Sequence, residues 1–598
     1  MNAKGNETDI RMLSRLMLRL LPAQVLLSAA GSVNGIVSGV FASNFIGTDA
    51  MSAVGIYAPL NLLITSVSMI LVGGSVIICG KLLGKGTGEK MQEVFSMDLA
   101  WSLLIALILT AIFIPAALFD LTGILTSDTA VRDVFNRYLL GQAPGLFPLL
   151  AGNTLAAFLS MENRAKRTYA ASFIYIVSNV ALNFLFVARL GMGAFGLALA
   201  SSLGAWGFLL VQAVAFLKKG SVLRLSFRKG SASLGRDIFR VGLPGAASNV
   251  YQSARGLIVN RLIEAFVGSI GISAFAASDT LMRIFWALPV GMLAVSRMMI
   301  SISAGEEDRR SLADIMRVMA RRYLPIMCAV SALIVACAGP FAGIFYSDAS
   351  SEVYVMTVWG FRILPLCMPL SVIYMHFACW YQVSGKSFPV HLLALLDGVV
   401  CVAGFTAMLI GRFGMNSVYI ANVLNGVVTT LVIAAYSCIK NGRLPRGMEE
   451  MMVMEEGFGA PEERRLDISV DDMDEVLTVS RRLQQFCLER GVDERRSFLA
   501  ALCMEEMAGN IVSHGFTKDE KKHSIEIRAV IKDDDVILRI RDDCVPFDPY
   551  ERSRIFDGDD VLKNIGIRLV YKAATEVTYN NILGLNVLTV RLREPPAK

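Results

Sequence analysis

Three polar residues close to the C-terminus recur at intervals of four. Glu506, Asn510 and His514 lie within the stretch EEMAGNIVSHG, which runs from Glu505 to Gly515. In a helix this spacing places all three side chains on one face. Such a face could hold a carboxylate and a Mg²⁺ ligand together. A polar face of this kind is unusual for core packing, so we expect the helix to line a site where chemistry takes place.

The segments around this helix alternate between two hydrophobic periods. Helical periodicity predicts amphipathic helices from about 472 to 489 and from 494 to about 514. Alternation with a period of two predicts strands at RLDISV, beginning at Arg465, and near 524–531, 536–542, 576–579 and 586–592. Together these elements predict a two-layer α/β sandwich over residues 464–598.

Two further motifs follow the polar helix. RDDCVPFDP spans Arg541 to Pro549, and NIGIRLVYKAATEVTYNNILGLNVLTV spans Asn564 to Val590. In this order, the three stretches resemble the boxes of GHKL-type ATPases (histidine-kinase-like ATPases), most closely the small anti-sigma-factor serine kinases. The resemblance implies a domain that binds ATP and Mg²⁺.

The resemblance also assigns roles to the matching positions. Glu506 stands where the family has its general base, and Asn510 where it has a Mg²⁺ ligand. Asp542 matches the residue that accepts the adenine amino group. The other expected nucleotide-binding residues are His514, Phe547, Asn564 and Gly566. Asn564 and Gly566 belong to a phosphate loop that leads into a helix, whose N-terminal amides favour phosphate. Cys544 and Asn564 replace glycines that are common in the family.

The rest of the chain has the composition of a membrane protein. The 598 residues are 54% hydrophobic and 18% charged, with a mean hydropathy of +0.54, well outside the range of soluble proteins. The apolar runs predict an all-α polytopic region of twelve spans. They lie near 20–46, 51–79, 96–119, 134–159, 168–188, 194–217, 238–267, 270–300, 323–346, 353–381, 388–411 and 417–439.

Loop charge predicts the orientation of these spans. Basic residues precede the first span, follow the second (Lys81, Lys85 and Lys90) and follow the sixth, over 218–229. Basic loops face the cytoplasm. We therefore expect a multi-pass protein of the bacterial inner membrane with both termini in the cytoplasm. The net charge of +6 lies mostly in these loops and gives no support for nucleic-acid binding.

An internal repeat divides the membrane region. At an offset of 221, Gly35, Phe45, Gly47, Ser52, Ala53 and Leu60 correspond to Gly256, Phe266, Gly268, Ser273, Ala274 and Leu281. At an offset of 223, Gly191 corresponds to Gly414. The repeat predicts two six-helix halves at 1–220 and 221–445, then a linker at 446–463. Such repeats are typical of transporters that bind their substrate between the halves.

Several motifs connect this region with a known family. The stretch SNFIGTDAMSAVGIYAPLNLLITSVSMILVGGSVIICGKLLGKGTGEK (Ser43 to Lys90), the pair Asn163 and Arg164, NVALNFLFV from Asn179, and GMGAFGLALAS from Gly191 resemble segments of the multidrug and toxic compound extrusion (MATE) family. The resemblance covers roughly residues 10 to 442. It implies a secondary antiporter that exports drugs or other organic compounds in exchange for H⁺ or Na⁺.

The residues that could couple transport to an ion are less conventional. Many MATE proteins place an aspartate in the first helix, but here that position is Ser38, with Asn34 one turn earlier. Acidic residues in apolar segments are costly and are candidates for function. The candidates are Glu264, Asp279 and Asp397. Asp279 could instead form an ion pair with Arg283, and Glu264 could be a solvated helix end, whereas Asp397 has no evident local partner.

Three functions fit the whole sequence. The first is a MATE-like antiporter with a regulatory ATP-binding domain. The second is a membrane-anchored serine/threonine kinase that acts on an anti-sigma-factor-antagonist-like partner, with the helices as a sensor. The third is a flippase for lipid-linked precursors, which the intramembrane arginines would suit. These arginines are Arg255, Arg261, Arg297 and Arg362.

Overall fold

The computed structural model describes most of the chain in two parts, a helical bundle and a smaller α/β domain. The described residues are 2–87, 90–124, 129–162, 164–217, 231–516, 523–532, 535–550 and 565–593. Asn163, Asn564 and the predicted basic loop over 218–229 lie outside them.

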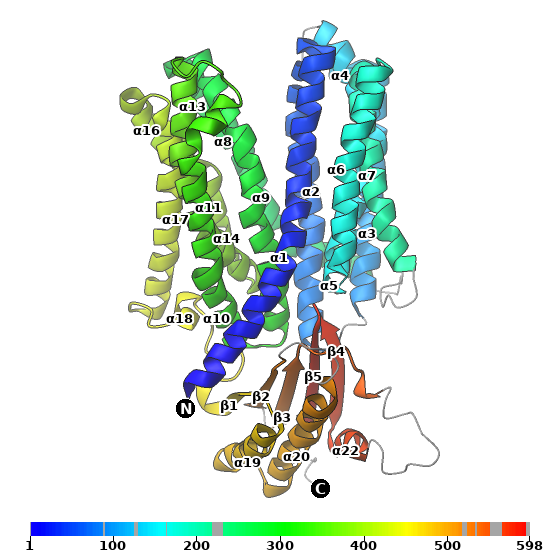
Figure 1. Cartoon of the computed structure of the whole chain (residues 1–598), viewed down its shortest axis with the longest axis vertical. Helices are drawn as coiled ribbons and strands as arrows, with labels where there is room; N and C mark the ends of the chain where they lie inside the picture. The colour runs from blue at the N-terminus through cyan, green and yellow to red at the C-terminus, as the bar shows by residue number, and fades with distance from the viewer. Residues whose placement is uncertain are drawn as a thin grey trace.

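The bundle consists of two groups of helices (Figure 1). The first group comprises α1 (Asn2–Phe41), α2 (Thr48–Gly84), α3 (Met91–Leu118), α4 (Thr129–Gln142), α5 (Leu146–Met161), α6 (Ala165–Asn183) and α7 (Gly193–Leu217). The second comprises α8 (Ser231–Phe266), α9 (Ser269–Gly305), α10 (Arg309–Val318), α11 (Leu324–Ala336), α12 (Ala338–Gly343), α13 (Glu352–Ile363), α14 (Cys367–Val383), α15 (Ser387–Leu395), α16 (Cys401–Phe413) and α17 (Asn416–Asn441). A short helix, α18 (Met448–Met451), lies in the linker.

Eleven helical segments among the described residues are long and apolar enough to cross a membrane. The sequence predicts twelve, and the difference lies in α8. This helix is 36 residues long, but charged residues such as Asp237, Arg240 and Arg255 lower its hydropathy. The structure therefore shows a multi-pass membrane protein, and the twelfth span stays a prediction.

The two groups touch closely at the end of the bundle that carries the α/β domain, which we call the proximal end. A Cβ added to Gly74 would lie 2.2 Å from the carbonyl oxygen of Ile238, and one added to Gly305 would lie 2.3 Å from that of Lys81. At the opposite, distal end the groups separate (Figure 1), and a Cβ on Gly35 would meet no atom within 4 Å. The two groups therefore pack tightly at the proximal end and diverge toward the distal end.

Glycines that correspond in the predicted repeat adopt similar backbones. Gly47 begins α2 with φ 120° and ψ −171°, and Gly268 begins α9 with φ 83° and ψ −167°. Gly191 and Gly414 both have positive φ, of 61° and 51°. A residue with a Cβ is disfavoured in these conformations, which explains glycine at both members of each pair. The geometry agrees with the predicted halves, although their division into six helices each stays a prediction.

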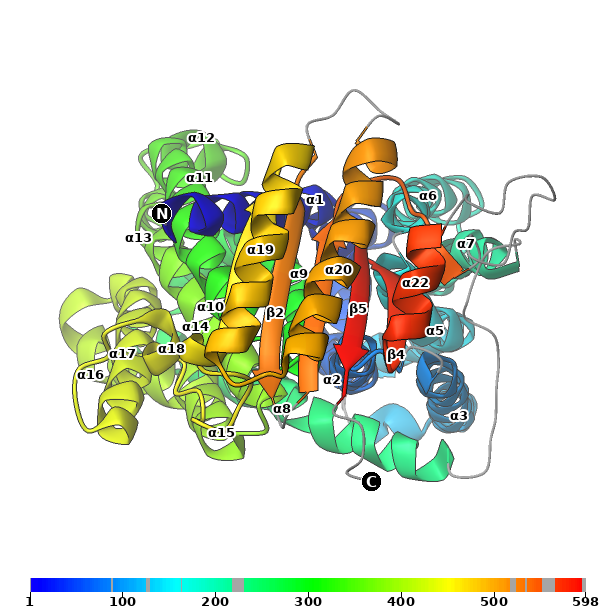
Figure 2. The same ribbon diagram turned by 90° about the horizontal axis from the view of Figure 1, so that it is seen from below.

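The α/β domain contains the predicted two layers. Its sheet has the order β1-β2-β3-β5-β4, and every neighbouring pair is antiparallel. The strands are β1 (Arg465–Val470), β2 (Ile525–Lys532), β3 (Asp535–Asp542), β4 (Glu576–Ile582) and β5 (Leu585–Leu592). Helices α19 (Met473–Glu489), α20 (Glu494–Asn510) and α22 (Ile565–Ala573) cover the face that points away from the bundle (Figure 2).

Strand β3 divides its side chains between the two faces of this sheet. Val536, Leu538 and Ile540 are fully buried in the core formed with α19 and α20. The alternate residues Arg539 and Arg541 point the other way, to the bundle, because side chains along a strand alternate with a period of two. The helix-covered face therefore holds the domain core, and the opposite face makes the contact with the bundle.

Candidate nucleotide site, transport residues and their connection

Helix α20 positions the polar residues predicted from the sequence. Asp493 caps its N-terminus by accepting a hydrogen bond from the Arg496 amide at 2.9 Å, and its apolar side packs on the sheet. Near its end, Asn510 Nδ2 donates to the Glu506 carbonyl at 2.7 Å. Because the amide nitrogen is bound to the helix itself, the Asn510 side chain presents its oxygen as the free ligand atom, which is the donor that Mg²⁺ prefers.

Glu506 lies directly against the start of α22. A Cβ added to Gly566 would come within 1.8 Å of Glu506 Oε2, so a larger residue here would push this carboxylate out of its present position. The structure thus brings together the predicted general base and the predicted phosphate loop, although they are far apart in the sequence. The N-terminal amides of α22 lie next to this carboxylate, where they could bind a phosphate group.

His514 departs from the predicted helical face. The α-helix ends at Asn510, and residues Ile511–Gly515 form one π-helical turn. A π turn is wider than an α turn, so the interval of four no longer places a side chain directly above the previous one. His514 is exposed, whereas Glu506 and Asn510 are half-buried at the site.

Asp542 lies at the end of β3 in a buried polar network. Its Oδ1 accepts hydrogen bonds from Asn586 Nδ2 at 2.7 Å and from the Cys544 amide at 3.0 Å. Burial raises the pKa of Asp542, and the bond from Asn586 opposes this rise. The arrangement fixes the carboxylate at the edge of the helix-covered face, as recognition of an adenine amino group requires.

The sequence analysis missed Asn586 and Tyr579. These two residues hold the loop after β3, which is predicted to bind adenine, in place. The Tyr579 hydroxyl donates to Asn586 Oδ1 at 2.8 Å and accepts the Phe547 amide at 3.0 Å. Asn586 lies directly opposite Asp542 in the β3–β5 register. A buried asparagine in an alternating strand was the available signal. Phe547 is 38% exposed, so its ring remains available to a ligand.

The residues present fit a Mg²⁺-nucleotide. Asn510 supplies an oxygen ligand, Asp542 an acceptor for an amino group, and Gly566 close approach of the backbone to a phosphate. Asn564, which was also predicted to bind the nucleotide, lies outside the described residues.

Asp397 is the centre of a polar cluster within the second helix group. It lies in a π-helical turn, Leu396–Val400, between α15 and α16. Asn425 Nδ2 donates to Asp397 Oδ1 at 2.8 Å, and Arg255 donates to the Asp397 carbonyl at 3.3 Å. The Tyr374 hydroxyl also faces the carboxylate. As the sequence predicts, none of these partners is local: they come from α8, α14 and α17 and are distant in the sequence.

The other predicted transport residues lie in different surroundings. Asp279 forms the expected ion pair with Arg283, at 2.6 Å. Glu264 is exposed, two residues before the end of α8. Asn34 and Ser38 are buried one turn apart in α1. The structure therefore does not bring these four residues together with Asp397 into one site.

A buried carboxylate in the first helix group escaped the sequence analysis. Asp98 in α3 is fully buried, and its Oδ1 accepts a hydrogen bond from Thr154 at 3.4 Å. Its position near the start of a predicted span, where charges are common, hid it among loop residues. Burial without a cationic partner now makes Asp98 a further candidate for ion coupling.

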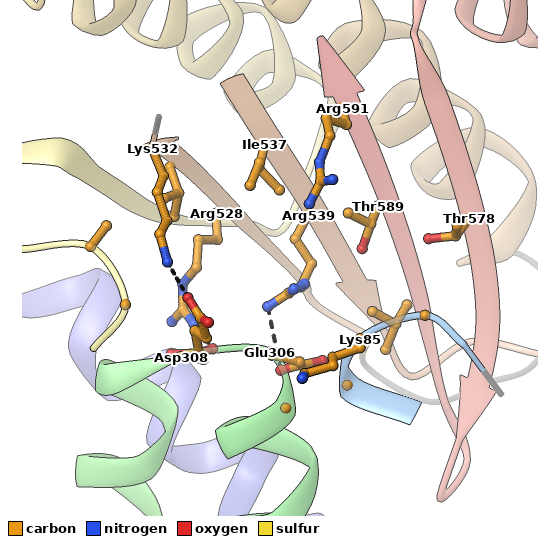
Figure 3. Close-up of a pocket in the computed structure, with 18 of the residues that line it drawn as sticks. Lys85, Glu306, Asp308, Arg528, Lys532, Ile537, Arg539, Thr578, Thr589 and Arg591 are labelled. Carbon is orange, nitrogen blue, oxygen red and sulfur yellow. Dashed lines mark hydrogen bonds and ion pairs between the residues drawn. The ribbon is translucent and has the colours of Figure 1, made fainter. Parts of the chain in front are cut away.

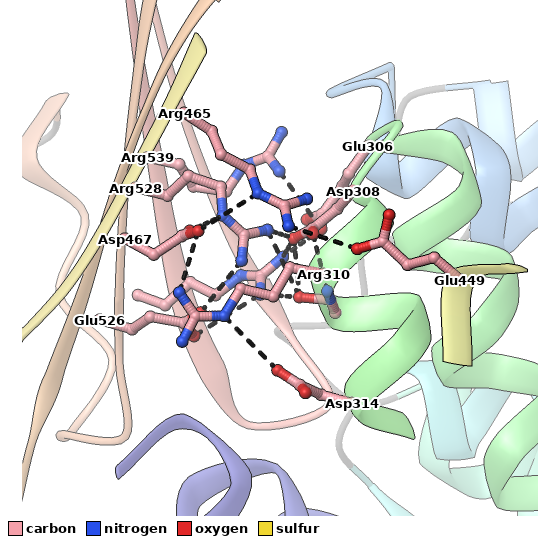
Figure 4. Close-up of polar contacts among 12 residues, drawn as sticks. Glu306, Asp308, Arg310, Asp314, Glu449, Arg465, Asp467, Glu526, Arg528 and Arg539 are labelled. Atoms are coloured by element: carbon pink, nitrogen blue, oxygen red, sulfur yellow. Dashed lines mark hydrogen bonds and ion pairs between the residues drawn. The ribbon is translucent and has the colours of Figure 1, made fainter. Parts of the chain in front are cut away.

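The α/β domain is attached to the bundle by a network of ion pairs (Figure 4). The acidic turn, Glu306 to Asp308, connects α9 and α10. Facing it are the four basic residues of β2 and β3, which we call the basic face: Arg528, Lys532, Arg539 and Arg541. Arg528 pairs with Asp308, and both side chains are almost fully buried, with exposed fractions of 6% and 2%. Lys532 pairs with Glu307, and Arg541 with Glu306.

The linker continues this network. Glu449 in α18 accepts from Arg309 at 3.0 Å and pairs with Arg465 of β1 at 3.3 Å. Burial would raise the pKa of Glu449, but the two arginines hold it below its ordinary value. Arg310 also reaches Asp467 of β1 at 3.0 Å. The second helix group is thus bound to β1, β2 and β3.

The first helix group meets the other side of the sheet. The tip of the β4–β5 hairpin, Leu583, is 1% exposed and belongs to the same apolar cluster as Met12 and Leu16 of α1. Gly86, after α2, lies beside Thr578 of β4, with 3.9 Å between an added Cβ and the Thr578 Cβ. The domain consequently contacts both helix groups at the proximal end.

The fold and the site define a multi-pass membrane protein with an ATPase-like domain packed on one end of its bundle. Comparison with known proteins agrees: the chain carries a MatE domain at residues 25–185 and a histidine kinase-like ATPase domain at residues 470–592.

Known relatives match the membrane region. Multidrug export protein MepA of Staphylococcus saprophyticus is 21% identical over 417 residues, which cover 68% of this chain and 88% of that protein. Probable multidrug resistance protein YoeA of Bacillus subtilis is 26% identical over 333 residues, covering 53% and 69%. Among solved structures, the outward-facing conformation of a multidrug resistance MATE family transporter matches with a TM-score of 0.65 and 21% identity, covering 70% of this chain and 94% of that one. At this identity the structural match shows the fold alone.

Proposed function

We propose that this protein is a MATE-like secondary antiporter that exports drugs or other organic compounds, and that its ATPase domain regulates export by bracing the proximal end. One observation carries the proposal: a single sheet contacts both helix groups at the proximal end, where the groups pack tightly, while the groups diverge at the distal end. Alternating access requires this closure to open in each cycle. A domain that spans the closure can therefore control the cycle.

The proximal end faces the cytoplasm in this proposal. Lys81, Lys85 and Lys90 lie at that end, and basic loops stay on the cytoplasmic side. The protein is then a component of the bacterial inner membrane, open to the outside, with its nucleotide site supplied by cytoplasmic ATP. Because the helix-covered face points away from the bundle, ATP reaches its site while the domain remains docked (Figure 2).

Strand β3 provides the mechanical connection between the two sites. Asp542 faces the nucleotide side, and its neighbour Arg541 holds Glu306 on the opposite side. A shift of β3 when a nucleotide binds to Asp542 changes the position of Arg541 against the acidic turn. Binding of ATP thus biases the bundle to one state, with the size of the bias set by the difference in affinity between states.

Asp397 is our assignment for the coupling carboxylate, binding H⁺ or Na⁺. It is the intramembrane acid with hydrogen-bond donors from two other helices but no direct cationic partner for its carboxylate. Export from proteoliposomes under an imposed ion gradient tests this. Asp397→Asn should abolish gradient-driven export, whereas Asp279→Asn, which removes only an exposed ion pair, should leave it nearly unchanged. Retained export in Asp397→Asn would refute the assignment.

Cross-linking the ATPase-like domain to the first helix group tests the regulatory role. The Cβ separation between Gly86 and Thr578 lies within the range of a disulfide, so the pair Gly86→Cys and Thr578→Cys can be cross-linked. Oxidation should stop export, and reduction should restore it, while either single substitution has no redox effect. Undiminished export by the cross-linked protein would show that the domain does not control opening.

A second function is favoured by the exposed nucleotide site. Glu506 sits beside Gly566 on the face directed away from the bundle, where a soluble protein such as an anti-sigma-factor-antagonist-like partner can approach. The domain would then act as a serine/threonine kinase. ATP binding and phosphotransfer by the full chain, with and without Mg²⁺, distinguish the two. Asn510→Ala should lose Mg²⁺-dependent binding, and Glu506→Ala should lose phosphotransfer while keeping export.

A further inference from the structure

A cavity of about 370 Å³ lies between the sheet and the proximal end of the bundle (Figure 3). Its walls come from four parts of the chain: the end of α2 with Lys85 and Gly86, the acidic turn with its flanking residues, the linker at Gly459 and Ala460, and the five strands of the sheet. The predicted nucleotide site lies on the opposite face of the same sheet. The cavity is therefore a separate space, at the joint between the domain and both helix groups.

The cavity has an excess of positive charge. Seven cationic side chains line it and only five carboxylates; the cations are Lys85, Arg309, Arg465, Arg528, Lys532, Arg539 and Arg591. Most of them have close carboxylate partners. Arg539 also pairs with Glu306, at 3.4 Å, but it shares this carboxylate with Arg541. Among the described residues, Arg539 Nε is buried without a hydrogen-bond partner, and Lys85 is exposed with no ion pair.

We propose that this cavity binds a small metabolite that carries a phosphoryl group. A phosphoryl group has close to two negative charges and three strong acceptors, which suits the cations Lys85, which has no ion pair among the described residues, and Arg539, which shares its carboxylate. Arginine and lysine are the usual donors to such a group. The cavity volume left beside a phosphoryl group corresponds to roughly ten waters, so the ligand is larger than inorganic phosphate. Thr578, Thr589 and Asn580 can hydrogen-bond its polar body, and among the described residues no aromatic side chain lines the cavity to stack on a base.

The ligand would connect the two helix groups. Lys85 belongs to the first group, and Arg539 reaches Glu306 of the second. A bound anion satisfies both cations and keeps the domain docked, and so holds the bundle closed at its proximal end. This regulatory consequence rests on the proposed function, whereas the binding itself does not.

Isothermal titration of the purified full chain tests the proposal, with glycerol 3-phosphate, pyrophosphate and inorganic phosphate as probes. Lys85→Gln and Thr578→Val should each weaken binding of glycerol 3-phosphate, the first by about tenfold because one charge-assisted contact is lost. The control Asp542→Asn, in the nucleotide site, should leave the affinity unchanged.

The possible outcomes separate cleanly. Loss of affinity in Lys85→Gln but not in Asp542→Asn supports the cavity. The reverse pattern would place the anion in the nucleotide site and overturn the proposal, as would equal affinity in all variants, which means an adventitious ion only. If glycerol 3-phosphate binds in the cavity but does not change export, the binding site is supported and its regulatory role is refuted.

Discussion

Replacing Asp308 by asparagine would test whether the ion pairs hold the domain on the bundle. Asp308 has two roles: its carboxylate pairs with Arg528, and its Oδ1 caps α10 by accepting the Ser311 amide at 2.8 Å. Asparagine caps a helix as well as aspartate does. Asp308→Asn therefore removes the charge at the contact and leaves the helix start intact.

The expected loss is worked out from burial and remaining partners. Breaking a buried ion pair typically costs about 3–5 kcal/mol, because the remaining charge is buried alone. Here Arg528 keeps Asp467 as a second partner, so its charge is not left alone. We expect a smaller loss of about 1.5–3 kcal/mol, in the range of a hydrogen bond to a charged group. The docking equilibrium should shift roughly 10- to 150-fold.

The assay measures how often the joint opens. Val587 of β5 is 7% exposed and lines the joint, so a cysteine at this position reacts with a water-soluble maleimide only when the domain undocks. When opening is rapid, the labelling rate is proportional to the open population. Mass spectrometry of the peptide that contains Val587→Cys separates this site from the native cysteines. Asp308→Asn should accelerate its labelling by the same 10- to 150-fold.

A matched control comes from the distal end. Asp348 also accepts a backbone amide, that of Ser350 at 2.9 Å, but it is far from the domain. Asp348→Asn should leave the labelling rate unchanged. An unchanged rate in Asp308→Asn as well would show that the ion pairs contribute nothing to docking, and that the apolar hairpin contact alone holds the domain.

Three further predictions concern the domain. Gly566→Ala should displace the Glu506 side chain, whose oxygen lies 1.8 Å from the new Cβ. Any phosphotransfer should then fall at least tenfold, while ATP binding, measured by fluorescence, persists. Phosphotransfer at the full rate would contradict the contact between Gly566 and Glu506. Leu583→Asn relaxes a positive φ of 55° in the hairpin, so the thermal stability of the domain should not fall. The same change removes the apolar contact of the hairpin with α1, so maleimide labelling at the joint should increase. Nucleotide affinity should decline as pH falls through the raised pKa of Asp542, because the protonated carboxyl has lost its charge and is a weaker hydrogen-bond acceptor. The decline should begin above the ordinary value of 3.8, and in Asp542→Asn binding should be weak at every pH.

The local parts of the fold follow from the sequence pattern. Period-two alternation predicted the strands to within a few residues, since β3 has one face in the core and one on the bundle. Apolar runs predicted eleven spans that match long apolar helices, and the twelfth, in α8, stays a prediction because charged residues lower the hydropathy of that helix. In each case the signal is local, because it depends on neighbours along one helix or strand.

The contacts between distant segments could not be predicted in this way. Asp397 gains its partners from three other helices, and Asn586 meets Asp542 only through the register of two strands. The whole docking interface was also missed. The sequence analysis assigned no role to Arg539 and Arg541, because an alternating pattern cannot distinguish a strand face that meets water from one that meets a charged partner.

The order of the elements along the chain has a consequence for synthesis. The acidic turn leaves the ribosome well before Arg541, by more than two hundred residues. At about 5–20 residues per second, the delay is roughly 10–50 s. During that interval the proximal end has no domain packed on it. Under the proposed function, a newly made bundle would be free to open on both sides in turn, and control of the cycle would begin only when the β4–β5 hairpin, with Leu583 at its tip, has been made and has reached α1.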